Sequence, residues 1–452
     1  MQKYLPLVVL FMVVLAELVS AMTHGGGYYD PRLTVKVNKL GKVRGKKEIP
    51  TYVKRPFYSY LGVPYAEDPR YHLRFKEPKE YPGWEGRFGF DGILDATEHP
   101  PPCLQPNMIK LARGKLEAMG EENCLTLNVF TSQPNNRTAK LPVMVYIHGG
   151  GYWFGSAKDA YPHVLLNKDL DIVLVSIQYR LGVLGFLSTE DDVMSGNLGL
   201  KDQAMAIAWV LLVPPVFEFQ LAFFFGNASP LCLFNYAVYY LFPVGLFQRA
   251  ILQSGSALCP WSIGATDQLS LAKRVAATVD CPTEEGSEAM HNCFKTANTT
   301  TIMISIFETF EYGRNPLVFG PRVDGEFLPE RPEVLLKKGR FNKVPIMTGT
   351  TRDEGAISTL ALLWNTHMHN DMDNNFWMRG STNFDGDDDI ELTKLIFRHY
   401  FGERQPTIDD HLILTEIYTS TSFSVCQDVT ALLLSHNLAQ QHSVYSYTLT
   451  HR

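Results

Sequence analysis

The sequence predicts an α/β fold in which helices alternate with the strands of a mostly parallel sheet. Two apolar runs, at 143–147 and 172–177, each end in a polar or glycine-rich turn, which is typical of buried parallel strands. The segment 201–210 follows them with apolar side chains at helical spacing. Further strands, separated in several places by helical segments, are predicted at 250–253, 344–348 and 444–449. In such folds, functional residues gather at the carboxyl ends of the strands.

Size and composition favour a large folded unit. The 452 residues are 45% hydrophobic, which is enough to bury an extensive core, and α/β enzymes of this length are often built as one unit. Charged residues make up 19% of the chain, and the net charge is −6. Because no basic patch stands out, we expect no nucleic-acid partner.

Residues 1–21 have the pattern of a secretory signal peptide. Lys3 supplies the positive charge, an apolar stretch covers 7–16, and the small residues at 19–21 form a cleavage site. The alternative is a membrane anchor, but the apolar stretch is short for a bilayer span. We therefore predict a secreted, extracellular protein whose mature part, 22–452, forms one domain.

Secretion changes how the cysteines are interpreted, because pairing is expected in an oxidising compartment. The seven cysteines are Cys103, Cys124, Cys232, Cys259, Cys281, Cys293 and Cys426. An odd number leaves one over, and no spacing resembles a zinc site. Sequons for N-glycosylation begin at Asn136 and Asn298, which fits a secreted protein.

An acidic run at 383–389 raises the question of a calcium site. The run lacks a glycine at the position where an EF-hand loop requires one. Asp388 and Asp389 instead precede an apolar helical segment, where carboxylates offset the helix dipole. We therefore predict the start of a helix here and no metal site.

A glycine-rich loop, His148-Gly-Gly-Gly151, comes directly after the first buried strand. Glycines let backbone N–H groups turn inward and approach a ligand closely. Such a loop can hold the negative oxygen of a tetrahedral intermediate. Taken alone, the loop could equally be only a tight turn.

The loop is one of a series of motifs whose combination is far more specific than any single member. In chain order they are Leu61-Gly-Val-Pro-Tyr-Ala66, Glu122-Asn-Cys-Leu-Thr-Leu-Asn-Val-Phe130, His148-Gly-Gly-Gly-Tyr152, Tyr179-Arg-Leu-Gly-Val-Leu-Gly-Phe-Leu187, Gly196-Asn-Leu-Gly-Leu-Lys-Asp-Gln203, Gly245-Leu-Phe-Gln-Arg-Ala-Ile-Leu-Gln-Ser-Gly-Ser256, Val323-Asp-Gly-Glu-Phe327 and Asp353-Glu-Gly355. This order and spacing strongly resemble the type-B carboxylesterases, a cholinesterase-like family that includes insect-type esterases. The resemblance runs from about Pro56 to the end of the chain, except for one segment.

The resemblance implies an α/β-hydrolase fold and hydrolysis of carboxylic esters by a serine triad. The oxyanion donors of the family match Gly150 and Gly151, and its triad acid matches Glu354. Without the family, Asp353 would be an equal candidate for the acid. No metal or organic cofactor is implied, and the expected substrates are small carboxylic esters.

The resemblance also implies disulfide pairs. Family disulfides match Cys103–Cys124 and Cys281–Cys293. Cys426 matches a third disulfide whose partner would lie beyond residue 452.

The segment 211–244 departs from the family, and it includes the place of the nucleophile. The chain contains no G-x-S-x-G, the strand-to-helix turn that presents the serine. Gly226-Asn-Ala-Ser-Pro230 stands there instead, so that Ala228 occupies the nucleophile position and Ser229 is one place late. Pro230 removes an N–H and restricts Ser229. A membrane-spanning helix is the alternative for this segment, but prolines interrupt it.

The family places its catalytic histidine in an H-G motif that would lie past His451-Arg452, so we expect a C-terminally truncated domain. Losing the serine or the histidine costs a serine protease on the order of a millionfold in rate. We therefore predict an esterase that is inactive as written. The alternative is a non-catalytic, secreted cholinesterase-like protein that binds or adheres to protein partners. Retention of Gly150, Gly151 and Glu354 argues against a long-standing loss of catalysis.

Overall fold

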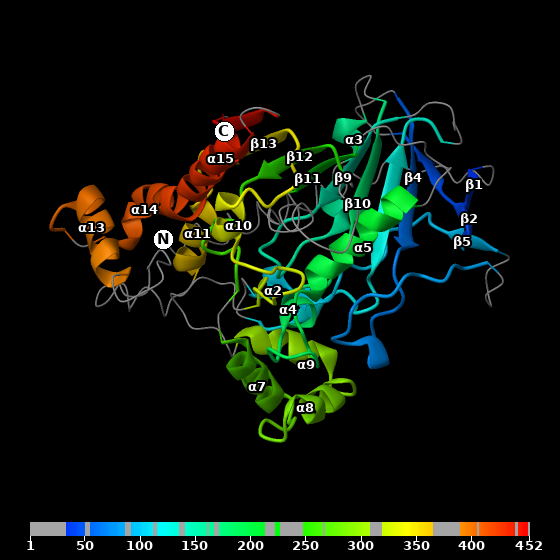
Figure 1. The fold of residues 1–452 in the computed structure, drawn as a ribbon, viewed down its shortest axis with the longest axis horizontal. Coiled ribbons are helices and arrows are strands. Elements are labelled where there is room, and N and C mark those ends of the chain that lie inside the picture. Colours follow the sequence, from blue (N-terminus) through cyan, green and yellow to red (C-terminus); the bar gives the residue numbers. More distant parts are fainter. Residues whose placement is uncertain are drawn as a thin grey trace, which may run out of the picture.

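A twisted, mostly parallel sheet forms the centre of the computed structural model (Figure 1). The residues described are 33–49, 55–85, 92–111, 115–134, 141–160, 162–166, 171–212, 222–226, 247–264, 267–307, 319–364, 389–404, 406–438 and 442–450. Within them, the sheet joins nine strands in the spatial order β14-β13-β12-β11-β9-β10-β8-β4-β3. The strands are β3 (Lys46–Glu48), β4 (Phe57–Pro64), β8 (Thr126–Thr131), β9 (Val143–Ile147), β10 (Val173–Ile177), β11 (Ala222–Gly226), β12 (Arg249–Gln253), β13 (Ile346–Thr351) and β14 (Val444–Leu449).

The predicted fold class is confirmed, because the six neighbouring strands β10, β9, β11, β12, β13 and β14 run parallel to one another. The strands β8, β4 and β3 extend the sheet with antiparallel pairs. Two small sheets accompany it: β1 (Thr34–Val37), β2 (Gly41–Arg44) and β5 (Ile93–Asp95) form one, and β6 (Gln105–Pro106) and β7 (Ala118–Met119) form the other.

Helices alternate with these strands along the chain. The α-helices are α2 (Met108–Leu111), α3 (Pro162–Leu165), α4 (Gly182–Phe186), α5 (Leu198–Leu212), α7 (Gln268–Thr278), α8 (Ser287–Phe294), α9 (Thr299–Ile304), α10 (Pro332–Lys337), α11 (Ala356–Trp364), α13 (Asp389–Phe401), α14 (His411–Thr419) and α15 (Val425–Leu438). The shorter turns are the 3-10 helices η1 (Tyr71–Leu73), η2 (Ala157–Ala160), η3 (Ser305–Phe307) and η4 (Ile408–Asp410), and the π-helix η5 (Ser420–Ser424). In Figure 1, α7, α8 and α9 lie together away from the sheet. The helices α13, α14 and α15 follow one another from the left edge toward the sheet, and α15 lies beside β13.

The predicted strands form where apolar runs allow burial on both faces. All five residues of β10 are buried, as are four of the five in β9. The strand predicted at 344–348 corresponds to β13, which begins at Ile346 rather than at Val344. The intervening Pro345 has no N–H to donate to a ladder, so regular pairing starts after it.

The segment 211–244 contributes β11 to the middle of the sheet, between β9 and β12. The described residues include no helix long and apolar enough to cross a membrane. Downstream, α13 begins at Asp389, where a helix start was predicted; most of the acidic run itself lies outside the described residues. In the part of the chain that the structure describes, no group of three or more metal-binding side chains gathers.

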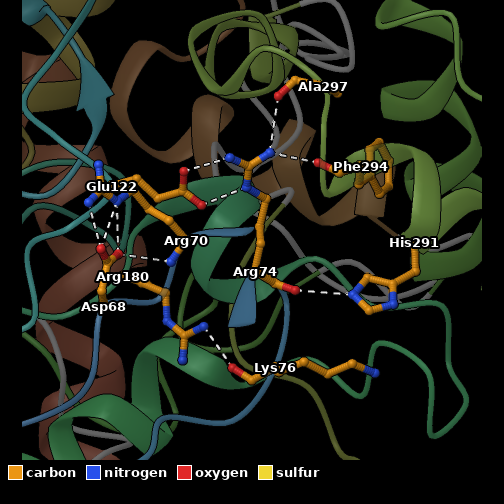
Figure 2. Close-up of polar contacts among 9 residues, drawn as sticks. All are labelled: Asp68, Arg70, Arg74, Lys76, Glu122, Arg180, His291, Phe294 and Ala297. Carbon is orange, nitrogen blue, oxygen red and sulfur yellow. Dashed lines mark hydrogen bonds and ion pairs between the residues drawn. The ribbon is translucent and has the colours of Figure 1, made fainter. Parts of the chain in front are cut away.

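A buried ion pair joins the end of β10 to α5. The Nε and Nη2 atoms of Arg180 donate to the two carboxylate oxygens of Asp202 at 2.8 and 2.7 Å, and the Arg180 amide donates to the same carboxylate at 3.0 Å. The two side chains are 3% and 0% exposed. The remaining guanidinium nitrogen, Nη1, donates to the carbonyl of Lys76 at 2.8 Å (Figure 2). One guanidinium therefore ties together three segments that are far apart in the sequence.

A second buried pair anchors α8. Arg74 donates to both carboxylate oxygens of Glu122, at 2.6 and 2.8 Å, and to the carbonyls of Phe294 and Ala297, at 2.7 and 3.0 Å. The ring Nε2 of His291 lies 3.1 Å from the Arg74 carbonyl (Figure 2). The peripheral helix α8 and the turn before α9 are thus attached to the main body by a buried charged contact in which each guanidinium nitrogen of Arg74 donates a hydrogen bond.

Three disulfides lie within the described residues: Cys103–Cys124, Cys281–Cys293 and Cys259–Cys426. The first two are the pairs that the family resemblance implies. The prediction that the partner of Cys426 lies beyond residue 452 is wrong, because Cys426 bonds to Cys259. The loop after β12 packs on the start of α15, where Ser256 Oγ donates to the Cys426 carbonyl at 3.1 Å, and this contact brings the two sulfurs together. Cys232 lies outside the described residues.

We expect Asp202→Asn to lower the free energy of unfolding by about 3–5 kcal/mol, because Arg180 would stay buried without its counter-charge. Urea unfolding followed by circular dichroism measures this change. The matched control is Glu284→Gln, which removes the partner of Lys273 in an exposed pair and should leave the unfolding midpoint unchanged. Equal losses in the two variants would contradict a special role for the buried pair.

Candidate active site

The parallel strands bring several loops to one edge of the sheet. Gly226, the last residue of β11, pairs with Ile147, the last residue of β9, and also with Leu252 near the end of β12. The strand β12 in turn pairs with β13, so that Gln253 lies opposite Gly349. The loops that leave these strands therefore start side by side, as expected for the functional edge of a parallel sheet.

The loop after β9 is compact and depends on glycine. Gly150 has φ 109°, and a Cβ atom on it would lie 1.9 Å from the carbonyl oxygen of Phe154. Gly151 also has a positive φ, 59°. The amides of Trp153 and Phe154 donate to the Gly150 carbonyl at 3.0 and 3.3 Å, which closes the turn. A side chain at Gly150 would therefore force this turn open.

Closing the turn leaves two backbone amides unused. Within the described residues, the N–H groups of Gly150 and Gly151 donate to no protein acceptor. Both residues are partly exposed. Adjacent amides without an internal partner can bind an oxygen atom that carries negative charge.

The His148 side chain packs the start of this loop against Tyr179, which follows the end of β10. Its ring is fully buried and stacks on Tyr179, with ring centroids 4.4 Å apart and an angle of 16° between the planes. The Tyr179 hydroxyl donates to the His148 carbonyl at 3.0 Å. The ring Nδ1 lies 2.9 Å from the carbonyl oxygen of Gly149 and must donate to it, while the buried Nε2 has no partner among the described residues. Burial lowers the pKa of His148 to about 4, so the imidazole is neutral near pH 7.

Glu354 lies three residues after the end of β13, in a tight turn. Its Oε1 accepts from the Thr351 amide at 2.7 Å. The next residue, Gly355, packs against α14: its amide donates to Thr419 Oγ1 at 2.8 Å, and a Cβ atom on it would lie 2.3 Å from the Thr415 carbonyl. The glycine of the Asp-Glu-Gly motif is therefore needed for the close contact with α14 that fixes this turn.

The neighbours of Glu354 distinguish it from Asp353. The Asp353 carboxylate faces Arg352 at 2.6 Å, and both side chains are exposed. Glu354 is half-buried and lies near Tyr447 of β14, whose pKa is raised by burial and by the Glu354 charge. With three strand spacings between β9 and β13, about 14 Å separates the two loops, which leaves room for other groups between them.

Several predicted residues lie outside the described part of the chain, namely Ala228, Ser229, Asn136 and His451. Two serines after β12 are described. Ser254 has φ 59°, and the buried Ser256 hydroxyl accepts from Thr430 Oγ1 at 2.8 Å while donating to the Cys426 carbonyl. Ser256 is thus committed to packing rather than to chemistry.

Asn298 is exposed and caps α9 by accepting from the Thr301 amide at 3.0 Å. Sequence reasoning did not assign roles to Tyr179 or Gln105, although both contact the loop after β9. Tyr179 lies within a recognised motif, but nothing in the sequence links Gln105 to this loop.

Comparison with known proteins matches most of the chain to one family. The model of the carboxylesterase family matches residues 31–214 and 233–452. The unmatched stretch, 215–232, lies within the segment 211–244 that departs from the family motifs, and it contains β11.

Individual relatives point the same way. The chain is 33% identical over 412 residues to Esterase E4 of Myzus persicae, covering 85% of this chain and 69% of that protein. It is 35% identical over 357 residues to Pyrethroid hydrolase Ces2a of Mus musculus, covering 76% and 60%. Neuroligin-2 of Mus musculus is 30% identical over 369 residues, covering 73% and 42%.

The buried imidazole of His148 predicts a pH dependence of stability. In the unfolded chain it takes up a proton near pH 6.5, but in the folded protein only near pH 4. Between these values the unfolded state binds more protons, so stability is lost as the pH falls. His148→Phe keeps a ring against Tyr179 but has no group that titrates. As the pH falls from 7 to 4, we expect the free energy of unfolding of this variant to rise by up to about 3 kcal/mol relative to that of the parent protein.

Urea unfolding of both proteins across this pH range measures the difference, in which the titration of all other groups cancels. A difference that stays constant with pH would contradict the prediction.

Proposed function

Because the chain belongs to the carboxylesterase family, we propose that the loop after β9 and the turn after β13 are parts of an ester-hydrolysing site. Gly150 and Gly151 are the oxyanion donors, and Glu354 is the acid. The observation that carries this proposal is the pair of unused amides in a glycine-dependent turn, at the same sheet edge as Glu354. The substrates are small carboxylic esters.

The proposed site suits acyl transfer through a serine. In that reaction, the serine oxygen bonds to the ester carbonyl carbon, and the serine proton passes to an imidazole. The carbonyl oxygen gains negative charge and is held by the amides of Gly150 and Gly151. The alcohol then leaves with the proton, and water hydrolyses the acyl-enzyme. Glu354 would orient the imidazole and stabilise its charged form, without a metal or organic cofactor.

The nucleophile is one of two triad residues that residues 1–452 do not supply; the histidine motif of the family would lie past residue 452. Two residues after the end of β11, the position of the serine is held by Ala228, whose methyl group cannot attack an ester. The family model passes over residues 215–232, which supports a local loss rather than gradual divergence. We therefore propose that the protein as written retains the scaffold of an esterase but is inactive.

A second candidate is a secreted, non-catalytic protein that binds protein partners. Ala228 at the nucleophile position favours it, and the similarity to neuroligin-2 is compatible with it. The unused amides of Gly150 and Gly151 favour the first candidate, because a binding protein has no need of them. Secretion is proposed from the signal-like residues 1–21 and from the sequons.

Rebuilding the nucleophile tests the proposed function. The double variant Ala228→Ser with Pro230→Gly recreates G-x-S-x-G after β11. The parent chain should not hydrolyse p-nitrophenyl butyrate above background, because loss of the serine alone costs on the order of a millionfold. The family's histidine motif would lie past residue 452, so imidazole is added to the assay as the base. Under these conditions we expect the double variant to release p-nitrophenol at least about tenfold faster than the parent, because only the variant has a serine oxygen that can attack the ester beside the donors of Gly150 and Gly151.

Glu354→Gln, added to the double variant, should reduce this gain, whereas Glu326→Gln, a carboxylate on a different loop, should not. A double variant that keeps the parent's circular dichroism spectrum but gains no reactivity would count against the esterase site and for the binding protein.

Asn298 should carry a glycan when the protein is made in a eukaryotic secretory system, because its side chain is exposed at the start of α9. Thr300→Ala removes the sequon without touching the cap that Asn298 provides, so it should abolish the glycan and leave stability unchanged. Peptide mapping by mass spectrometry before and after peptide N-glycosidase F measures occupancy. Thr299→Ala leaves the sequon intact and is the control; an unmodified peptide in the parent protein would refute the assignment.

A further inference from the structure

We propose that Gln105 is a positioning residue that holds the oxyanion loop, 148–155, in its reactive shape. This inference rests on the proposed function, since it concerns the same loop. Gln105 lies in β6, outside every motif that marks the site, and touches neither Gly150 nor Gly151. Its effect on the loop is carried by Gly155.

The side-chain amide of Gln105 binds the backbone of Gly155 on both sides. Its Nε2 donates to the Gly155 carbonyl at 2.9 Å, and its Oε1 accepts from the Gly155 amide at 2.9 Å. Nε2 also donates to the Cys103 carbonyl at 2.9 Å. The side chain is buried, with 5% of the residue exposed. An amide group matches a backbone donor and acceptor at once, and a carboxylate or an apolar group cannot.

Gly155 in turn sets the start of the loop. It has φ 122°, and a Cβ atom on it would lie 2.3 Å from His148 Nδ1 and 2.4 Å from the Gly149 carbonyl. The end of the loop therefore lies directly on its first two residues. Fixing Gly155 fixes the ring and the peptide group that precede Gly150, and with them the direction of the next two amides.

The anchor for Gln105 is itself rigid. Cys103, two residues earlier, is bonded to Cys124. In addition, the Leu104 amide donates to the Glu121 carbonyl at 2.9 Å, and Gln105 pairs with Met119 of β7. The disulfide loop thus presents a fixed amide group to the oxyanion loop. Donors that are held in place before the reaction stabilise charge best, because they need no reorganisation when charge develops.

Hydrogen–deuterium exchange of the peptide covering 148–157, measured by mass spectrometry on the full chain, tests this role. At pH 8 we expect Gln105→Leu and Gln105→Glu to exchange in this peptide about tenfold faster than the parent protein, equivalent to about 1.4 kcal/mol. At pH 5 the Gln105→Glu variant should approach the parent, because a protonated carboxyl group both donates and accepts. The Gln105→Leu variant should stay fast at both pH values. This pH-dependent rescue is not expected from a side chain that only fills space.

The matched control is Gln427→Leu. Gln427 is also buried and donates to backbone carbonyls, those of Gly255 and Gly349, but on the α15 side of the sheet. It should not accelerate exchange at 148–157 beyond the average for the protein. Unchanged exchange in both Gln105 variants, equal acceleration by Gln427→Leu, or absence of the rescue at pH 5 would each overturn the proposal. None of these readouts depends on ester hydrolysis, so failure of the proposed function is detected separately.

Discussion

The buried ion pair between Arg180 and Asp202 is the contact on which the central architecture depends. It joins the exit of β10 to α5, the helix that leads toward β11. Charges this deeply buried are tolerated only when they are paired and hydrogen-bonded, and here each of the three guanidinium nitrogens donates to a protein oxygen. The pair therefore specifies one packing of α5 on the sheet, because any other would leave a charge without its partner.

The consequence for the site follows from sequence adjacency. Tyr179 directly precedes Arg180. Its ring stacks on the ring of His148, and its hydroxyl donates to the His148 carbonyl. The backbone held by the ion pair is thus the same backbone that supports the oxyanion loop from one side. Gln105 supports the loop from the other side, through Gly155. The two amides lie between supports that come from different parts of the chain.

The sequence was sufficient where the deciding interactions are local. Apolar runs predicted β9 and β10, and a motif of three residues located Glu354 and the glycine that packs on α14. It was insufficient where the interaction joins distant segments. Gln105 and Gly155 are 50 residues apart, and Cys259 and Cys426 are 167 apart, so no local pattern records either pair. The strand β11 is instructive, because a short apolar run sufficed for a central strand in a stretch that the family model does not match.

The Cys259–Cys426 bond closes a single covalent ring that contains β13 and the helices α7, α8, α9, α10, α11, α13 and α14. A protease that cuts once inside this ring, for example in the turns around α8, would produce two polypeptides that remain one molecule until the disulfide is reduced. A protein cut in this way would therefore migrate as one intact chain on a non-reducing gel. The strands before and after the cut would stay covalently linked, so they could still pair with each other in one sheet. For this chain, cleavage and dissociation are therefore separate events as long as its disulfides stay oxidised.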